Sequence, residues 1–99
     1  MARSILQRRL VDASERLKRL RAELAVTEEQ LAFLEEEADD SRLRALVAET
    51  PLAEAEALDS RRHADALARQ RDALVLAVAR LRGEQDSLLD RMADELAAH

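Results

Sequence analysis

The sequence predicts an all-α protein: a long antiparallel helical hairpin, a coiled coil folded on itself, with a short helix at the tip. Three observations support this prediction. The chain of 99 residues has one Phe, one Gly and one Pro, which leaves little material for a large core or many turns. Two stretches carry apolar residues at alternating spacings of three and four. The one Pro lies between these stretches, where the chain would reverse.

The first stretch predicts a helix over about residues 3–37. Its apolar residues follow a heptad repeat, in which the a and d positions face a partner helix. We call the a and d positions of a helix its seam. The a positions are all Leu, and the d positions are mostly Leu: Leu10, Leu17, Leu24 and Leu31 at a, with Leu6, Ala13, Leu20, Thr27 and Leu34 at d. A repeat this regular over four heptads predicts packing against another helix.

Residues 38–60 form the predicted tip. Continuing the first seam would turn Ala38, Ser41 and Ala45 inward and leave Leu43 and Leu46 elsewhere, so we expect a break. Residues 39–41 are Asp, Asp and Ser, which are good N-cap types, and they predict a short helix over about residues 41–49. Thr50 and Pro51 then predict the next helix start, with Thr50 as the N-cap.

The last stretch predicts a helix over about residues 51–96. Its seam has Leu67, Leu74, Leu81 and Leu88 at d, and Ala64, Arg71, Val78, Gln85 and Met92 at a. Gly83 lies inside this helix and should weaken it by about 1 kcal/mol relative to Ala. The whole chain, residues 1–99, is predicted to form one hairpin domain.

The two seams also predict how the helices pair. In an antiparallel pair, the numbers of facing residues add to a constant. A sum of 98 sets Leu10 against Leu88 and places Glu35 near Arg61, whereas a sum of 105 sets Leu10 against Glu95. We therefore expect the sum of 98. It leaves two polar layers, Thr27 with Arg71 and Ala13 with Gln85, which can fix the alignment at a cost in stability.

Composition and charge limit the classes of function that the chain can have. The net charge of −5 divides into +5 for residues 1–21, −10 for residues 22–60 and 0 for residues 61–99. The basic start could contact phosphate, but the acidic residues of 84–99 can pair with it, so we do not expect direct nucleic-acid binding. The absence of Cys excludes disulfides and thiolate metal sites. We expect no secretory leader and no membrane span, hence a cytoplasmic protein.

An acidic cluster marks the end of the first predicted helix: Glu35, Glu36, Glu37, Asp39 and Asp40. In arm length and tip acidity the hairpin resembles the coiled-coil arm of Gre-type transcript cleavage factors. That resemblance implies a carboxylate-tipped arm that holds Mg²⁺ inside the channel of RNA polymerase. The acidic-aromatic tip motif and the C-terminal globular domain of that family are missing. The alternative is a solvated face whose carboxylates pair with Arg61, Arg62 and His63.

No residues predict catalysis. The chain has no Ser/His/Asp grouping, no Gly-rich phosphate loop and no basic–aromatic alternation. Glu56, Asp59 and His63 share one helical face and could bind a metal with Glu35 or Glu37 opposite. A single His among carboxylates is more often an ion-pair partner, so we expect no metal, no cofactor and no enzyme activity.

Apolar residues outside the seams predict a binding surface. On the last helix these are Val75, Leu89 and Leu96, and on the first they are Ile5, Val26 and Phe33. Such rows indicate a second copy of the chain or another protein. The tip adds Leu43, Leu46, Val47, Leu52 and Leu58. We expect three or four of these five to fold back as a cap on the open end of the hairpin; the alternative is a partner groove that receives Leu43, Leu46 and Val47.

These observations predict a non-catalytic interaction or adaptor protein that self-associates, as in a homodimer, or docks on a larger protein assembly. The alternative is a regulator that inserts its acidic arm into a nucleic-acid machine such as RNA polymerase or the ribosome. In its two seams and its Ala, Leu and Arg content, the chain resembles small coiled-coil proteins of unassigned function from GC-rich bacterial genomes. That resemblance implies a bacterial origin and no activity.

Overall fold

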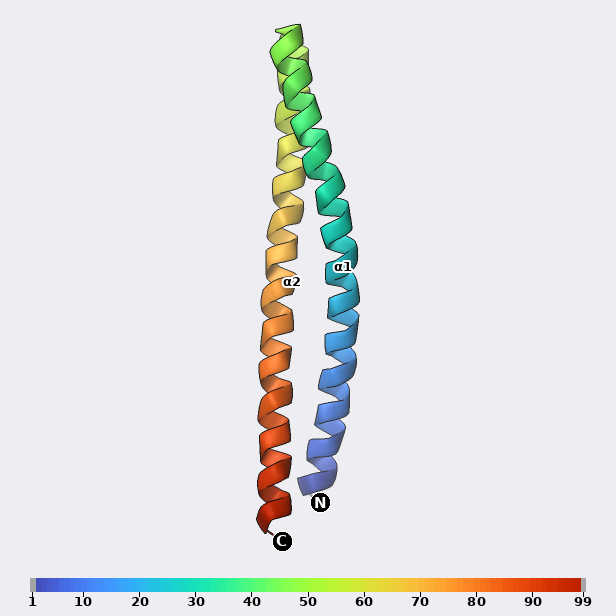
Figure 1. Ribbon diagram of the computed structural model, residues 1–99, viewed down its shortest axis with the longest axis vertical. Helices are drawn as coiled ribbons and strands as arrows, with labels where there is room; N and C mark the ends of the chain where they lie inside the picture. Colours follow the sequence, from blue (N-terminus) through green and yellow to red (C-terminus); the bar gives the residue numbers. More distant parts are fainter. Residues whose placement is uncertain (1, 99) are drawn as a thin grey trace. The chain divides into compact units, whose positions relative to one another are not determined.

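Two long helices account for nearly all of the protein (Figure 1). A computed structural model describes residues 2–98, in which α1 spans Ala2–Ala48 and α2 spans Pro51–Ala98. No strand occurs among these residues. The prediction of an all-α helical hairpin is therefore confirmed.

The connection between the helices consists of Glu49 and Thr50. Glu49 has a φ of 53°, and its amide donates a hydrogen bond to the Ala45 carbonyl at 3.0 Å. This is a left-handed residue ending a helix, a position that Gly usually occupies. The Thr50 hydroxyl accepts a hydrogen bond from the Ala53 amide at 3.2 Å. Thr50 is thus the N-cap of α2, as predicted, and Pro51 takes the first helical position.

The chain forms two compact units, and each contains part of both helices. The terminal unit comprises Met1–Glu23 and Leu74–His99, and the loop unit comprises Leu24–Ala73. Within each unit, α1 and α2 run antiparallel (Figure 1). The core of each unit is therefore the strip of side chains between its two helix segments.

In the terminal unit, the predicted seams face each other. Leu6, Ala13 and Leu88 form a buried cluster, against which Leu10 and Met92 pack. The Gln85 amide donates a hydrogen bond to the Ser14 hydroxyl at 3.0 Å, beside the predicted layer of Ala13 and Gln85. These contacts match the pairing whose residue numbers add to 98, because a sum of 105 would shift one helix by seven residues.

In the loop unit, the seam of α1 continues to the end of the helix. Leu31, Ala38 and Ala64 are buried, and so are Thr27 and Ser41. Arg71, predicted to lie opposite Thr27, is partly buried and forms an ion pair with its neighbour Asp72 at 2.7 Å. Across the described residues, every buried side-chain nitrogen or oxygen has a hydrogen-bond partner.

The predicted break near residue 38 is wrong. Residues 41–48 are helical, as expected, but they belong to α1 and form no separate helix. The reason is that Ala38, Ser41 and Ala45 keep the heptad phase. Their small side chains fill the seam because the facing residues of α2, such as Ala57, are small too. Packing against α2 outweighs the weak preference of Asp39 and Asp40 for a helix start.

Gly83 causes no break in α2, which is helical through this position. Its backbone has no positive φ, and a Cβ built there would meet no atom within 4 Å. The glycine is therefore an exposed helix position without a steric requirement for its missing side chain.

Candidate interaction surface in the loop unit

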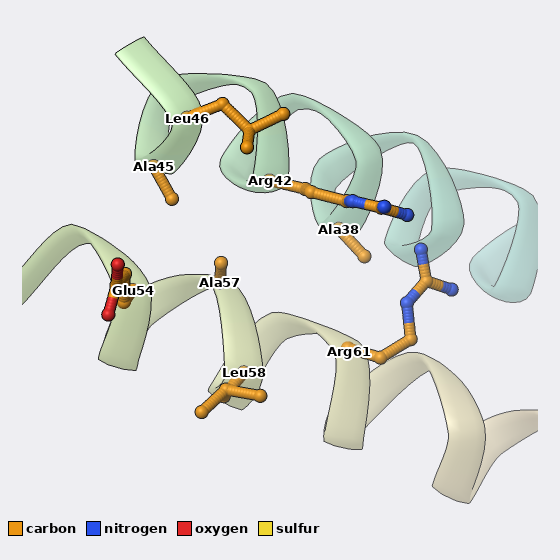
Figure 2. A pocket seen from close by; sticks show the side chains of 8 residues that line it. All are labelled: Ala38, Arg42, Ala45, Leu46, Glu54, Ala57, Leu58 and Arg61. Carbon is orange, nitrogen blue, oxygen red and sulfur yellow. The ribbon is translucent and has the colours of Figure 1, made fainter. Parts of the chain in front are cut away.

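A groove lies between α1 and α2 in the loop unit (Figure 2). Its volume is about 420 Å³. Ala38 and Ala45 of α1 and Ala57 of α2 face one another across its floor, since the seam here has only small residues. Arg42 and Arg61 extend toward one end of the groove. The remaining lining residues are Leu46, Glu54 and Leu58.

The large apolar side chains near the connection all face solvent. Leu46 is 65% exposed and Val47 is 86% exposed, and the other three are comparably open: Leu43, Leu52 and Leu58. The predicted cap is therefore wrong. Because Ala38, Ser41 and Ala45 continue the seam of α1, Leu43, Leu46 and Val47 lie outside that seam and stay exposed.

The acidic cluster has one ion pair among the described residues. Asp39 accepts a hydrogen bond from the Arg61 guanidinium at 2.8 Å. The predicted pair of Glu35 with Arg61 is wrong, because Arg61 pairs with Asp39, another member of the acidic cluster. The other four carboxylates are exposed: Glu35, Glu36, Glu37 and Asp40. They form a solvated face of α1.

The structure assembles no metal site from the described residues. No group of three or more His, Asp or Glu side chains lies close enough to hold an ion. Glu56, Asp59 and His63 therefore do not converge with Glu35 or Glu37. The polar side chains that line the groove are those of Arg42, Arg61 and Glu54.

The apolar residues predicted to bind a partner along the helices are exposed as well. Val75 is 45% exposed and Leu89 is 48% exposed, and the same holds for Leu96, Ile5, Val26 and Phe33. Sequence reasoning missed Val11, which lies outside the seam and is equally open. It also missed the groove. The sequence does indicate the groove through the small seam residues Ala38, Ser41 and Ala45, but the pattern of these residues alone predicts the end of the heptad repeat.

None of the described helices contains a segment that is long and apolar enough to cross a membrane. The comparisons with known proteins give no further assignment. No protein-family model, no curated protein and no solved structure matches this chain. The fold and the surface therefore define only the structural class of the protein. It is an all-α helical hairpin with apolar side chains exposed beside the connection between its helices.

Proposed function

We propose that this protein is a non-catalytic interaction module that docks on a larger protein through the end of its hairpin. The docking surface is the tip patch, which we define as Leu43, Leu46, Val47 and Leu52. One observation supports this proposal above all: the tip patch is solvent-exposed although the seam beside it is complete. Exposed apolar side chains that gather in one place favour binding, because a partner removes them from water.

The spacing of the tip patch indicates how the partner binds it. Leu43, Leu46 and Val47 occur at i, i+3 and i+4, so they project from one side of α1. An apolar groove on a partner receives helix residues with this spacing. Leu52 lies in the first turn of α2, directly after the connection. The partner would therefore contact both helices at the point where the chain reverses.

The test is a comparative pull-down with two double variants of the full chain. The first replaces Leu46 and Val47 by Glu and puts two charges into the tip patch. The control replaces Ala22 and Ala73 by Glu, which adds the same charges at exposed helix positions away from it. We expect proteins that bind the wild type and the control to be lost with the tip variant. Thermal stability should be nearly unchanged in both, since none of these side chains is buried.

The outcome divides the functional alternatives. Loss of RNA polymerase or ribosome subunits with the tip variant would favour the arm-type regulator, with the acidic residues 35–40 beside the contact. Equal recovery of all proteins by the wild type, the control and the tip variant would refute the tip patch as a docking surface. A tip variant that is helical but much less stable would instead mean that Leu46 contributes to the fold.

A further inference from the structure

The groove between α1 and α2 in the loop unit has charges of opposite sign at its two ends (Figure 2). Glu54 lies at the end nearest the connection, whereas the guanidinium groups of Arg42 and Arg61 extend toward the other end. Along α2, the distance from Glu54 to Arg61 corresponds to about 10 Å of helix. The remaining lining side chains are those of Ala and Leu. An occupant of the groove therefore needs an apolar body and a negative charge at its arginine end.

The two guanidinium groups have hydrogen-bonding capacity to spare. Arg61 donates one hydrogen bond, to Asp39 at 2.8 Å. Arg42 has no ion pair and no side-chain hydrogen bond within residues 2–98. A guanidinium group presents five N–H donors in one plane and commonly holds a carboxylate through two of them. Donors from both helices are thus available to one carboxylate at this end of the groove.

The charges at the arginine end match a ligand with a single negative charge. Arg42 and Arg61 contribute two positive charges and Asp39 one negative charge, which leaves +1. A carboxylate group carries −1, whereas a phosphate ester carries about −1.5 to −2 at pH 7. At the other end, Glu54 repels a second anionic group. This arrangement favours a monocarboxylate over a phosphate ester or a dicarboxylate.

The size and lining of the groove agree with a site for a small molecule. Such sites have volumes of about 300–1,000 Å³, are lined mostly by apolar side chains, and orient the ligand through a few polar groups. This groove has a volume of about 420 Å³. Beside its alanine floor, Leu46 is 65% exposed and Leu58 is 59% exposed. An apolar chain in the groove would remove both leucine side chains from water.

We propose that the groove binds a linear monocarboxylate with an apolar chain, such as a fatty acid of medium length. The carboxylate accepts hydrogen bonds from Arg42 and Arg61, and the apolar chain lies on the alanine floor and ends toward Glu54. This proposal goes beyond the proposed function, since it concerns a small-molecule ligand and does not depend on a protein partner. Leu46 belongs to both the groove and the tip patch, so the variants that test the groove leave Leu46 unchanged.

Isothermal titration calorimetry of the full chain with fatty acids tests the chemistry of the ligand. We expect saturable binding of decanoate, with one molecule per chain. From hexanoate through octanoate to decanoate, each added methylene should raise the affinity by about two- to fourfold, because it buries further apolar surface. Octanamide, the neutral analogue of octanoate, should bind about three- to tenfold more weakly, because it lacks the charge that the guanidinium groups bind.

Two arginine variants test the site of the carboxylate. Arg42→Gln and Arg61→Gln should each weaken decanoate binding by about three- to tenfold, because each removes a charged donor that solvent partly screens. The matched controls are Arg44→Gln and Arg62→Gln, which remove the same charge from exposed neighbours outside the groove. These controls should retain the affinity of the wild type. All four positions lie outside the buried core, so the variants should fold, as circular dichroism would verify.

An alanine of the floor tests the site of the apolar chain. Ala57→Leu places a larger side chain in the groove and should weaken decanoate binding by about tenfold or more, because the ligand loses the space that it occupies. Ala55→Leu makes the same change at an exposed position outside the groove and should have no effect. Should Ala57→Leu fail to fold, the arginine variants still decide the proposal.

Glu54 tests the orientation of the ligand. Decanedioate has the chain of decanoate and a second carboxylate at its far end. It should bind the wild type about threefold or more weakly than decanoate does, because the second carboxylate approaches Glu54. Glu54→Gln should remove most of this difference and leave the affinity for decanoate nearly unchanged. An equal preference for decanoate in the wild type and in Glu54→Gln would overturn the orientation.

Two results would overturn the binding of a monocarboxylate itself. One is a wild type without saturable binding up to about 5 mM decanoate, since a ligand of this size with modest efficiency has a dissociation constant of about 2 mM or lower. The other is equal affinity of the wild type, Arg42→Gln and Arg61→Gln. If decanoate does not bind but Ala57→Leu loses proteins that Ala55→Leu retains in a pull-down, the occupant is a protein segment and the proposal is wrong. The double variant of Leu46 and Val47 tests the tip patch separately.

Discussion

The side-chain amide of Gln85 in α2 donates a hydrogen bond of 3.0 Å to the hydroxyl of Ser14 in α1, and the two residues lie 71 positions apart in the sequence. Gln85 occupies a seam position, where Leu would contribute more to stability, and the bond satisfies its amide in a part-buried site. A polar residue in a seam commonly fixes the alignment of the helices at some cost in stability. We assign that role to this pair in the terminal unit.

The first prediction concerns this polar layer. Gln85→Leu should raise the free energy of unfolding by about 1 kcal/mol, because a part-buried amide is replaced by an apolar side chain. Ser14→Ala should act in the opposite direction and lower it by about 0.5–1.5 kcal/mol, because the amide of Gln85 loses its acceptor. Urea denaturation of both variants measures the two changes. A loss of stability in both would mean that the hydrogen bond contributes more than apolar packing does.

The second prediction compares two leucines of α2. Leu88 is 2% exposed in the core of the terminal unit, whereas Leu76 is exposed and lies outside the seam. Leu88→Ala should lower the free energy of unfolding by about 2–4 kcal/mol, because it leaves a cavity among Leu6, Leu10 and Ala13. Leu76→Ala should cost well under 1 kcal/mol. Equal losses in urea denaturation at one protein concentration would contradict the assigned seam.

The third prediction concerns the left-handed residue at the connection. Glu49→Gly should raise the free energy of unfolding by up to about 1 kcal/mol, because Gly adopts a positive φ without the strain of a Cβ. Glu49→Ala is the matched control: it removes the same charge but retains the Cβ, so it should give no such gain. If Ala and Gly stabilise the protein equally in thermal denaturation, the effect arises from the charge and not from the φ of 53°.

The fourth prediction concerns Gly83. Gly83→Ala should stabilise α2 by about 0.5–1 kcal/mol, because Ala restricts the unfolded chain and a Cβ at this site meets no neighbour. The midpoint of thermal unfolding should rise by several degrees, on the order of 4–8 °C per kcal/mol for a chain of this size. Ala22→Gly makes the reverse change at an exposed position of α1 and should lower the midpoint by a similar amount. A destabilised Gly83→Ala protein would imply a packing partner at this face, as in an assembly.

Part of the candidate surface was predictable from the sequence, and the rest was not. The exposure of Val75 and Leu89 follows from their heptad positions, which the sequence defines once the seam is known. The exposure of Leu46 and Val47 could not be predicted in this way. Three or more apolar residues off the seam can either cap the hairpin or face solvent, and heptad position alone does not distinguish a buried cap from a binding surface. The groove could not be predicted either. Ala38 and Ala45 look like the end of the heptad repeat unless the facing residues of α2 are known.

The sequence alone determined the two helices, the start of α2 at Thr50 and Pro51, and the pairing that sets Leu10 and Leu88 in one core. Each of these depends on local hydrogen bonding or on a strict seven-residue repeat, and both are properties of the chain itself. Only the tertiary structure decided that α1 continues to Ala48 and that Ser41 is buried. The physical reason is that small side chains bury area only when an equally small surface faces them, and here Ala57 of α2 lies across the same groove as Ala38 and Ala45.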